Sequence, residues 1–425
     1  MEQRFQAGSQ RLARKTLKIL IVSPRFPYPP RSGAATRVYQ LARQLSARHD
    51  VTVLSYASEH ERDGVVALAA QMRVRAVERP VLSARGKRAA QALTIVSRRP
   101  YYCRGIHSRD MQRAIDDLCS AQQFDLIQLE SSVLCALRFP GHPRLVIDEH
   151  NIESEIFRRT CDGERALPRR VFNHVEYLRF RRFERMWWKR VDACVVTSER
   201  ERPMVAACAP DTPVVAVPNS VDLDYFEPAS TPPESQTVVF NGILTYRPNV
   251  DAVRYLIDDI WPLVRARHPD ARLTLIGRSD GVDTRPLMAP GVEVLGEVPD
   301  IRPHVHRAAV VAVPVRIGGG TRLKVVEGLA MGKPIVSTTL GCEGLAVRDR
   351  EHLLIADDPR AFAERIFEVF ENPQRSAQLG SAGRRLVEDR YSWDLAAERL
   401  EALYRKLMGE QTGPSTETEL ATAGG

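Results

Sequence analysis

The chain has 425 residues, more than one hydrophobic core usually supports, so we expect two domains. With 44% hydrophobic and 27% charged residues, its composition is that of an ordinary globular protein and excludes a fibrous or largely disordered chain. A net charge of +8 indicates an anionic partner, which could be nucleic acid, phosphate or an acidic membrane surface.

The cysteines and the N-terminal segment indicate a compartment. The seven cysteines are scattered without a C-x-x-C pair, which predicts neither a zinc site nor a disulfide framework and fits a reducing environment. Residues 1–18 are basic and polar, without the apolar core of a signal peptide, and no apolar run approaches the length that crosses a bilayer. We expect a cytoplasmic protein, with any membrane contact peripheral and at the inner face.

Short β-branched runs alternate with amphipathic segments along the first half of the chain. The expected strands are residues 17–23, 50–56, 124–130, 144–150 and 192–198, with a helix at 35–49 between the first two. A strand, a helix and a second strand in this order form a βαβ unit. We therefore predict a doubly wound parallel sheet in a first, Rossmann-like domain at residues 16–216.

The series restarts after a proline-rich segment, Val217 to Pro233. Strands are expected at residues 237–243, 271–277, 291–297, 310–316 and 334–339, with a helix at about 250–268. We predict a second α/β domain at 217–390, a long amphipathic helix at 391–409, and disordered tails at 1–15 and 410–425. Two such sheets facing each other would bind ligands at the carboxyl ends of their strands.

The loop after the first strand argues against a dinucleotide site. It reads PRFPYPPRSGAATR, with four prolines and no G-x-G-x-x-G, so hydride chemistry with a nicotinamide cofactor is not indicated. Ser32 and Gly33 could still bring backbone N–H groups to an anion, and an ordinary βα loop explains them equally well.

A glycine-rich segment, RIGGGTRLKVVEGLAMGKPIVST, starts at Arg316. Gly319 and Gly320 let the backbone approach a ligand, and Thr321 is a suitable N-cap for the helix that follows. Arg322 and Lys324 would be unfavourable at the positive end of that helix unless an anion compensates them, and a phosphate group is the natural candidate.

Glu327 follows Lys324 by almost one helical turn. It could pair with Lys324 or accept hydrogen bonds from the hydroxyls of a ligand. The alternative for the whole segment is a plain helix cap with a Lys–Glu pair on the surface. The coincidence of three glycines with two cations favours the phosphate interpretation.

With these motifs, the sequence resembles a family-four retaining glycosyltransferase of GT-B fold. In that fold two Rossmann-like domains face each other across a cleft, and the final helix crosses back to the first domain. The resemblance rests on PPRSGAATRVYQLARQLSARHDVTVLS, DEHNIES, VPNSVDLDYF and GGGTRLKVVEGLAMGKPIVST. Two features of the family are missing. The first of two glutamates falls on Gly319, and a basic pair of the second domain is replaced by Ile243 and Pro248.

The resemblance implies a retaining transfer from a nucleotide-diphosphate sugar to a hydroxyl acceptor, with neither cofactor nor metal, as in polysaccharide biosynthesis. The acceptor could be a glycan, a lipid-linked sugar or a small molecule. The ribose would bind Glu327, and the diphosphate would lie at Thr321 beside Arg322 and Lys324, which would stabilise the leaving group. His150 matches a family histidine that approaches the donor sugar; a capped loop histidine is the alternative.

Two further segments have ordinary explanations. Asp222 and Asp224 resemble a metal-binding pair but match a structural turn of the family. The basic aromatic segment at 176–193 could lie on an anionic membrane, with Trp187 and Trp188 as anchors. The helical spacing of Tyr177, Phe180, Phe183 and Trp187 favours packing on the protein's own core. No module motif supports binding of nucleic acid.

Two other functions stay open. The missing carboxylate at Gly319 favours a GT-B scaffold that is catalytically inactive and serves as a binding subunit. An epimerase acting on a nucleotide sugar would need carboxylates around the sugar ring, and the sequence does not place such a set.

Overall fold

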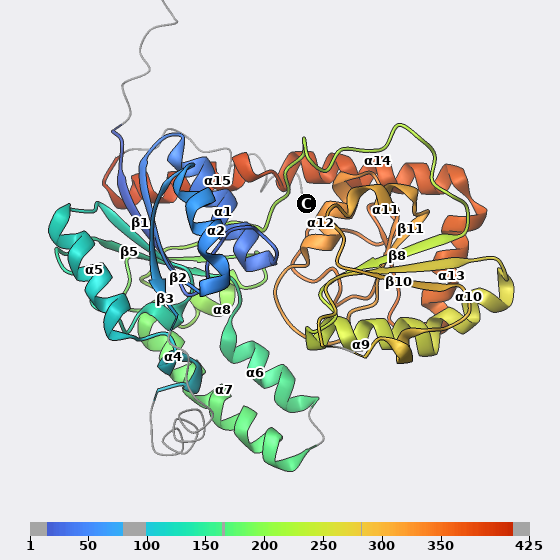
Figure 1. Ribbon diagram of the computed structural model, residues 1–425, viewed down its shortest axis with the longest axis horizontal. Helices are drawn as coiled ribbons and strands as arrows, with labels where there is room; N and C mark the ends of the chain where they lie inside the picture. Colours follow the sequence, from blue (N-terminus) through green and yellow to red (C-terminus); the bar gives the residue numbers. More distant parts are fainter. Residues whose placement is uncertain (1–14, 80–98, 164–165, 282, 411–425) are drawn as a thin grey trace, which may run out of the picture.

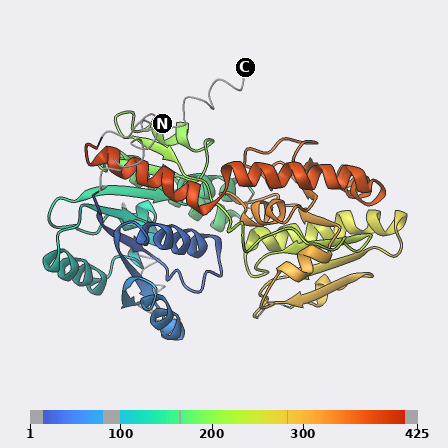
Figure 2. The same ribbon diagram turned by 90° about the horizontal axis from the view of Figure 1, so that it is seen from above.

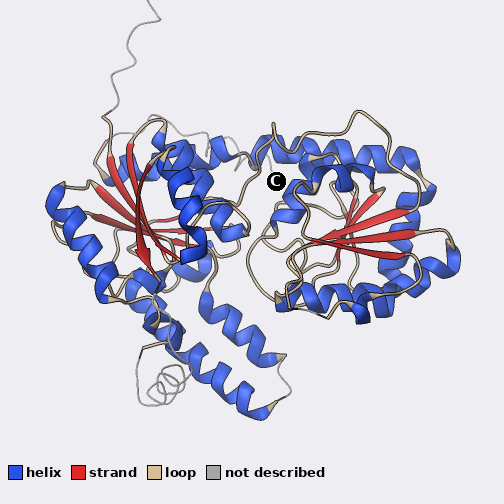
Figure 3. Cartoon of the chain, viewed as in Figure 1, coloured by secondary structure: helices blue, strands red, loops and turns tan. Residues whose placement is uncertain are grey.

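The computed structural model describes residues 15–79, 99–163, 166–281 and 283–410, and these form two α/β domains side by side (Figure 1). Each domain has a parallel sheet with helices on both faces (Figure 3). The predicted tails lie outside the described residues, except for Lys15 and Glu410. Within the described part of the chain, no helix has both the length and the apolar character needed to cross a membrane.

The sheet of the first domain has seven strands in the order β3-β2-β1-β4-β5-β6-β7, and all neighbours are parallel. The strands are β1 (Lys18–Ser23), β2 (Asp50–Ala57), β3 (Arg73–Glu78), β4 (Leu126–Leu129), β5 (Arg144–Glu149), β6 (Ala193–Val196) and β7 (Val214–Ala216). The five strands predicted for this half of the chain are confirmed. β3 and β7 were missed because β3 is a largely uncovered edge strand and β7 has only three residues.

The helices of the first domain are α1 (Gly33–Ser46), α2 (Arg62–Ala69), α4 (Tyr101–Arg104), α5 (Arg109–Ala121), α6 (Glu153–Asp162), α7 (Leu167–Trp188) and α8 (Arg202–Ala206). The Ser32 hydroxyl caps α1 by accepting a hydrogen bond from the Ala35 N–H. α6 and α7 project from the domain as a helical hairpin (Figure 1).

The second sheet has six strands in the order β10-β9-β8-β11-β12-β13, again parallel. They are β8 (Thr237–Asn241), β9 (Arg272–Ile276), β10 (Val292–Gly296), β11 (Val310–Val313), β12 (Ile335–Ser337) and β13 (Leu354–Ile355). The helices are α9 (Arg247–Tyr255), α10 (Trp261–Arg267), α11 (Arg302–Arg307), α12 (Leu323–Ala330), α13 (Pro359–Glu371) and α14 (Pro373–Arg390). The predicted doubly wound architecture is confirmed for both domains.

The helix expected at residues 250–268 is interrupted. A π-helical turn, Leu256–Ile260, separates α9 from α10. Pro262 stands in the first turn of α10, and because proline has no N–H it cannot continue the hydrogen-bond ladder of a single straight helix.

The last helix, α15 (Trp393–Leu407), leaves the second domain and packs on the first. Its Trp393, Leu400 and Tyr404 are buried in one cluster with β1 and α1 residues such as Ile19 and Leu41. Seen from above, α14 and α15 follow each other across both domains (Figure 2). The two domains are therefore connected at two places, by the segment after β7 and by the passage from α14 to α15.

The interpretation of Trp187 and Trp188 as membrane anchors is wrong. The Trp188 side chain is 3% exposed, and its indole N–H donates to Glu149 at 2.8 Å. Phe180 and Phe183 are buried in the same core, against which Trp187 packs. The packing interpretation of this face of α7 is confirmed.

Candidate active site between the two domains

The glycine-rich loop joins β11 to α12. Gly318 and Gly320 have φ values of 105° and 75°, which other residues rarely adopt, so the glycines are needed for the path of the backbone. The helix starts at Leu323, with Arg322 at the N-cap position. The prediction that Thr321 caps this helix is wrong, because its hydroxyl accepts a hydrogen bond from the Asn219 side chain at 2.8 Å instead.

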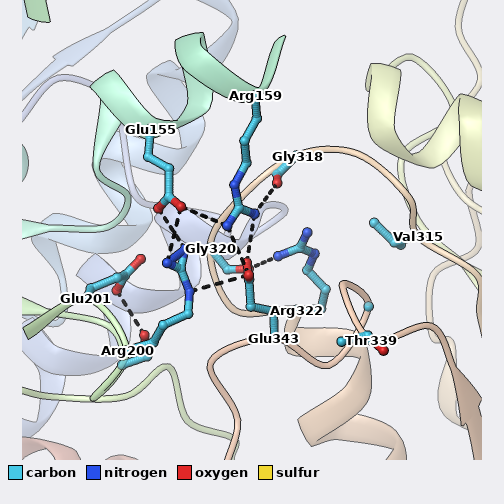
Figure 4. Close-up of polar contacts among 12 residues, drawn as sticks. Glu155, Arg159, Arg200, Glu201, Val315, Gly318, Gly320, Arg322, Thr339 and Glu343 are labelled. Atoms are coloured by element: carbon cyan, nitrogen blue, oxygen red, sulfur yellow. Dashed lines mark hydrogen bonds and ion pairs between the residues drawn. The ribbon is translucent and has the colours of Figure 1, made fainter. Parts of the chain in front are cut away.

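Arg322 lies in the loop, and only part of its guanidinium group is hydrogen-bonded. Its Nη1 donates to the Gly320 carbonyl, whereas its Nη2 is buried and has no hydrogen-bond partner among the described residues (Figure 4). Burial lowers the pKa of Arg322, although the neighbouring Tyr246 and the carboxylate of Glu343 partly oppose the shift. A buried guanidinium N–H without a partner is costly, which indicates that this group awaits an acceptor.

Lys324 is held beside β8. Its Nζ donates to Asn249 Oδ1 at 3.2 Å and lies 4.1 Å from the centre of the Phe240 ring. A Cβ atom at Gly242 would lie 2.7 Å from Nζ, so a side chain there would displace the Lys324 ammonium group. Burial, with a contribution from the charge of Arg322, lowers the pKa of Lys324 to about 7.

Glu327 projects from α12 near Lys324. Its carboxylate makes no hydrogen bond or ion pair with the described residues, so the Lys–Glu surface pair considered as an alternative does not form. Burial raises the pKa of Glu327 to about 7, although the charge of Lys324 partly opposes the shift. The carboxylate remains available to a ligand.

His150 follows β5 at its carboxyl end, and its backbone carbonyl lies beside Gly320 of the second domain. Its Nε2 donates to Glu130 at 2.6 Å, and Glu130 follows the neighbouring strand, β4. Burial alone would lower the pKa of His150, but the hydrogen bond and the negative charge of Glu130 outweigh it and raise the pKa. The pairing fixes the orientation of the ring, and contact of His150 with a donor sugar stays a prediction.

A buried arginine connects this part of the first domain to the glycine-rich loop. Arg37 of α1 forms a two-pronged ion pair with Asp148 of β5, both bonds being 2.9 Å. It also donates to the carbonyl of Val217 and to Asn219, at 2.8 and 3.1 Å. Since Asn219 in turn bonds Thr321, the network spans both domains and fixes the loop against the first.

The loops of the two domains also meet through close backbone contacts. A side chain at Gly320 would overlap Asn151, and a Cβ at Gly319 would lie 3.1 Å from Ile156 of α6. Gly33 lies next to Leu323, because its Cβ would be 3.6 Å from that side chain. The structure therefore brings together all three predicted groups: the loop at 319–324, His150 and the Ser32–Gly33 turn.

Four charged side chains hold the domains together at one edge of this site. Arg159 of α6 donates to Glu343 at 2.8 and 2.9 Å and to the Gly318 carbonyl at 3.1 Å (Figure 4). Arg200 lies 3.5 Å from Glu343 and donates to Glu155, which also accepts from Arg159. This network supports the glycine-rich loop from the first domain.

Sequence reasoning missed several residues of the site. The carboxylate of Glu153, at the start of α6, makes no hydrogen bond or ion pair with the described residues. Burial raises its pKa to about 7, although the charges of Arg25 and His150 oppose the shift. Burial raises the pKa of the Tyr246 hydroxyl, and the charges of Arg322, Glu153 and Arg25 also act on it. The motif DEHNIES contains Glu153, so its position after His150 was the available signal.

One group of side chains has the spacing of a metal site. Ligand atoms of Glu130, Asp148 and His150 lie within 4.8 Å of one another. Each is already engaged, because Asp148 binds Arg37, and Glu130 accepts from both His150 and Gln128. A divalent ion would have to displace these bonds next to the Arg37 cation. The donor set therefore fits a hydrogen-bonded network better than a metal.

A second hollow lies away from this region. A cavity of about 270 Å³ is lined by Thr237 at the start of β8, by Arg272 at the start of β9 and by Val292 at the start of β10. The amino ends of parallel strands are opposite to the end at which α/β sheets bind ligands. We do not assign it a part in the site.

Two doubly wound domains with a glycine-rich loop at their boundary define a protein of the GT-B class. A model of Glycosyltransferase Family 4 matches residues 31–225, and a model of Glycosyl transferases group 1 matches residues 235–372. The chain belongs to the family-four glycosyltransferases.

Two curated relatives show how far the similarity extends. A GDP-mannose-dependent monoacylated alpha-(1-6)-phosphatidylinositol monomannoside mannosyltransferase of Corynebacterium glutamicum is 28% identical over 205 residues, which are 43% of this chain and 54% of that protein. An uncharacterized 44.6 kDa protein in the cps region of Klebsiella pneumoniae is 20% identical over 258 residues, which are 57% of this chain and 63% of that protein. The matches span little more than half of each relative.

Solved structures support the fold over nearly the whole chain. The sucrose-phosphate synthase of Thermosynechococcus elongatus is 17% identical with a TM-score of 0.71, covering 92% of this chain and 99% of that one. Anabaena HepE in complex with UDP is 14% identical with a TM-score of 0.64, covering 92% and 100%. At such low identity these likenesses concern the GT-B fold alone.

Proposed function

We propose that the protein transfers a sugar from a nucleotide-diphosphate donor to a hydroxyl acceptor, with retention at the anomeric carbon and without a metal ion. The observation that carries the proposal is the buried Arg322 Nη2 without a partner, next to Lys324 and to a free Glu327 carboxylate. A diphosphate would satisfy the two cations, and ribose hydroxyls would satisfy the carboxylate.

Charge stabilisation of the leaving group would supply most of the rate enhancement. As the bond between the anomeric carbon and the donor phosphate breaks, negative charge grows on the diphosphate beside Arg322 and Lys324. The acceptor oxygen would bond to the anomeric carbon from the same face, and its proton would pass to the departing phosphate oxygen. His150, fixed by Glu130, would contact the donor sugar from the first domain.

The class of acceptor is proposed from the relatives. The Corynebacterium glutamicum relative is named for a phosphatidylinositol mannoside acceptor, and the Mycolicibacterium smegmatis protein, 28% identical over 158 residues, is named for a similar one. A hydroxyl of a lipid-linked sugar is therefore the first candidate, ahead of a free glycan.

A thermal-shift screen tests the proposal. UDP, GDP, ADP and dTDP are added separately to the full chain, with their common sugar derivatives as a second set. We expect one base to stabilise the protein, by about 2.7 kcal/mol at a concentration 100-fold above its Kd. No shift with any nucleotide would favour the inactive scaffold that Gly319 suggests, since no carboxylate stands there.

Metal independence has its own test. Once donor and acceptor are identified, turnover in EDTA should equal turnover in magnesium, because Arg322 and Lys324 neutralise the diphosphate. Loss of turnover in EDTA that is restored by a divalent cation would contradict this. The group of Glu130, Asp148 and His150 would then be the first place to look for the ion.

A further inference from the structure

The outward side of α7 combines exposed apolar side chains with arginines. Leu167, Val171 and Leu178 are 71%, 55% and 48% exposed. Separations of four and seven residues place the three on one side of the helix. The exposed Arg181, Arg182 and Arg185 continue this side toward the C-terminal end of α7. These six residues are called the α7 outer face.

The acidic residues of α7 all point the other way. Glu176 and Glu184 are the only acids in the helix, and they are 1% and 0% exposed. Glu176 accepts from the Tyr101 N–H, and Glu184 accepts from the Ser154 N–H. The three arginines of the outer face form no ion pair with a carboxylate of the described residues. The face is therefore apolar and cationic, without compensating acids.

A small cavity opens beside this face, between α6 and α7. Its volume is about 140 Å³, and Arg158, Arg181 and Arg185 line it together with Tyr177. Glu155 also borders it, but its carboxylate is held by Arg159 and Arg200. Arg158 is paired with Asp162 at 3.5 Å and lies 4.0 Å from Glu155, so Arg181 and Arg185 supply the guanidinium groups for a phosphate in this space.

The hairpin leads directly to the candidate site. α6 starts at Glu153, three residues after His150, and has ten residues. At a rise of 1.5 Å per residue, it carries the tip of the hairpin about 15 Å from the site. A surface in contact with the hairpin would thus lie within reach of the acceptor side of the first domain (Figure 1).

We propose that the α7 outer face docks on an anionic phospholipid leaflet. Leu167, Val171 and Leu178 enter the interfacial region, and Arg181 and Arg185 bind lipid phosphates at the cavity, which is the charge pattern of an interfacial helix. Trp187 and Trp188 take no part, since they belong to the core. The inference deepens the proposed function by naming where the acceptor comes from, but lipid binding itself needs neither donor nor transfer.

Co-sedimentation of the full chain with vesicles tests the inference. Phosphatidylcholine vesicles are compared with vesicles that contain about 30% phosphatidylglycerol, at low and high salt. We expect partitioning onto the anionic vesicles to be at least about 10-fold stronger, and to fall with salt. Equal partitioning onto both vesicles, or none, would overturn the proposal.

Matched variants localise the binding. Arg181→Gln, Arg182→Gln and Arg185→Gln together should reduce partitioning by about 10-fold or more, and Leu167→Ser with Leu178→Ser should also reduce it. The control changes three exposed arginines of the second domain, Arg278→Gln, Arg285→Gln and Arg348→Gln, and so removes the same charge. A control that loses as much binding would show that only net charge matters, against the proposal.

Further outcomes exclude other occupants. Inorganic phosphate and chloride are compared at the same ionic strength. If only phosphate displaces the protein from the vesicles, the face binds a free anion and not a lipid leaflet. Light scattering that finds a dimer lost in Leu178→Ser would indicate a second copy on this face. Either result would overturn the proposal, and neither would alter the nucleotide screen, so the two proposals fail separately.

Discussion

On the first-domain side of the site, Arg37 donates to Asp148, Val217 and Asn219, and His150 donates to Glu130. On the second-domain side, a buried Arg322 Nη2 has no partner, and the pKa of Lys324 and that of Glu327 are both shifted to about 7 by burial. On the first side these two pairs are satisfied as they stand and can orient a substrate, and Glu153 is the one group described there that has no partner among the described residues. The second side carries unmet polar groups whose cost only a ligand removes.

The largest expected effect comes from the cations of the second side. Arg322→Met and Lys324→Met should each lower kcat by about 10²–10³-fold, by analogy with the loss of one transition-state donor. Arg316→Met is the matched control, because Arg316 starts the same loop but pairs with Asp251 and lies over the Tyr255 ring. Steady-state kinetics measure the effect on kcat, and melting temperatures show whether the variants fold. Wild-type turnover in both variants would show that the loop has another purpose.

Glu327 should affect binding more than turnover. Glu327→Gln keeps the size of the side chain but accepts ribose hydroxyls less well, so the donor KM should rise about 10-fold, or about 1.4 kcal/mol. The kcat at saturating donor should change little. A variant with reduced kcat and an unchanged KM would place Glu327 at the reacting bond rather than at the ribose.

The buried Lys324 should destabilise the ligand-free protein. Its folded pKa of about 7 lies below the usual 10.4 of lysine, so the penalty is fully present below pH 7 and disappears as the pH rises toward 10.4. The free energy of unfolding of Lys324→Met should therefore exceed that of the wild type by about 1–2 kcal/mol at pH 7, and by less at pH 9.5. Denaturant unfolding at the two pH values measures the difference. A variant less stable than wild type at pH 7 would contradict the assignment.

The smallest effect is expected on the first side. The raised pKa of His150 stabilises the fold fully below about pH 6.5, and this stabilisation is lost as the pH rises through the folded pKa. Glu130→Gln should therefore lose more stability at pH 6 than at pH 8, relative to wild type. His150→Asn should show the same loss, and the double variant should lose no more than either one. Additive losses would mean that the two residues act separately.

Local patterns in the sequence were enough to predict the two sheets and the second-domain half of the site. Alternating β-branched strands and helices determine the sheets, and Arg322, Lys324 and Glu327 lie within six residues of one another. The predicted domain limits at 216 and 217, like the roles of the site residues, stay predictions.

The first-domain half could not be predicted in the same way. Arg37 and Asp148 are 111 residues apart, and in the sequence Arg37 looks like an ordinary cation of an amphipathic helix. Glu130 likewise acquires its partner only when β4 pairs with β5. The failed N-cap has a similar cause, because Thr321 is engaged by Asn219, a residue of the interdomain connection.

The central claim is that the loop at 318–324 binds the diphosphate of the donor. Isothermal titration of UDP, GDP, ADP and dTDP into the wild-type chain and into the Arg322→Met, Lys324→Met double variant tests it most directly. We expect one nucleotide to bind the wild type, and the double variant to bind it at least about 100-fold more weakly. The affinity of Arg316→Met for that nucleotide should stay within about twofold of wild type. Equal affinity of the wild type and the double variant for that nucleotide would contradict the claim.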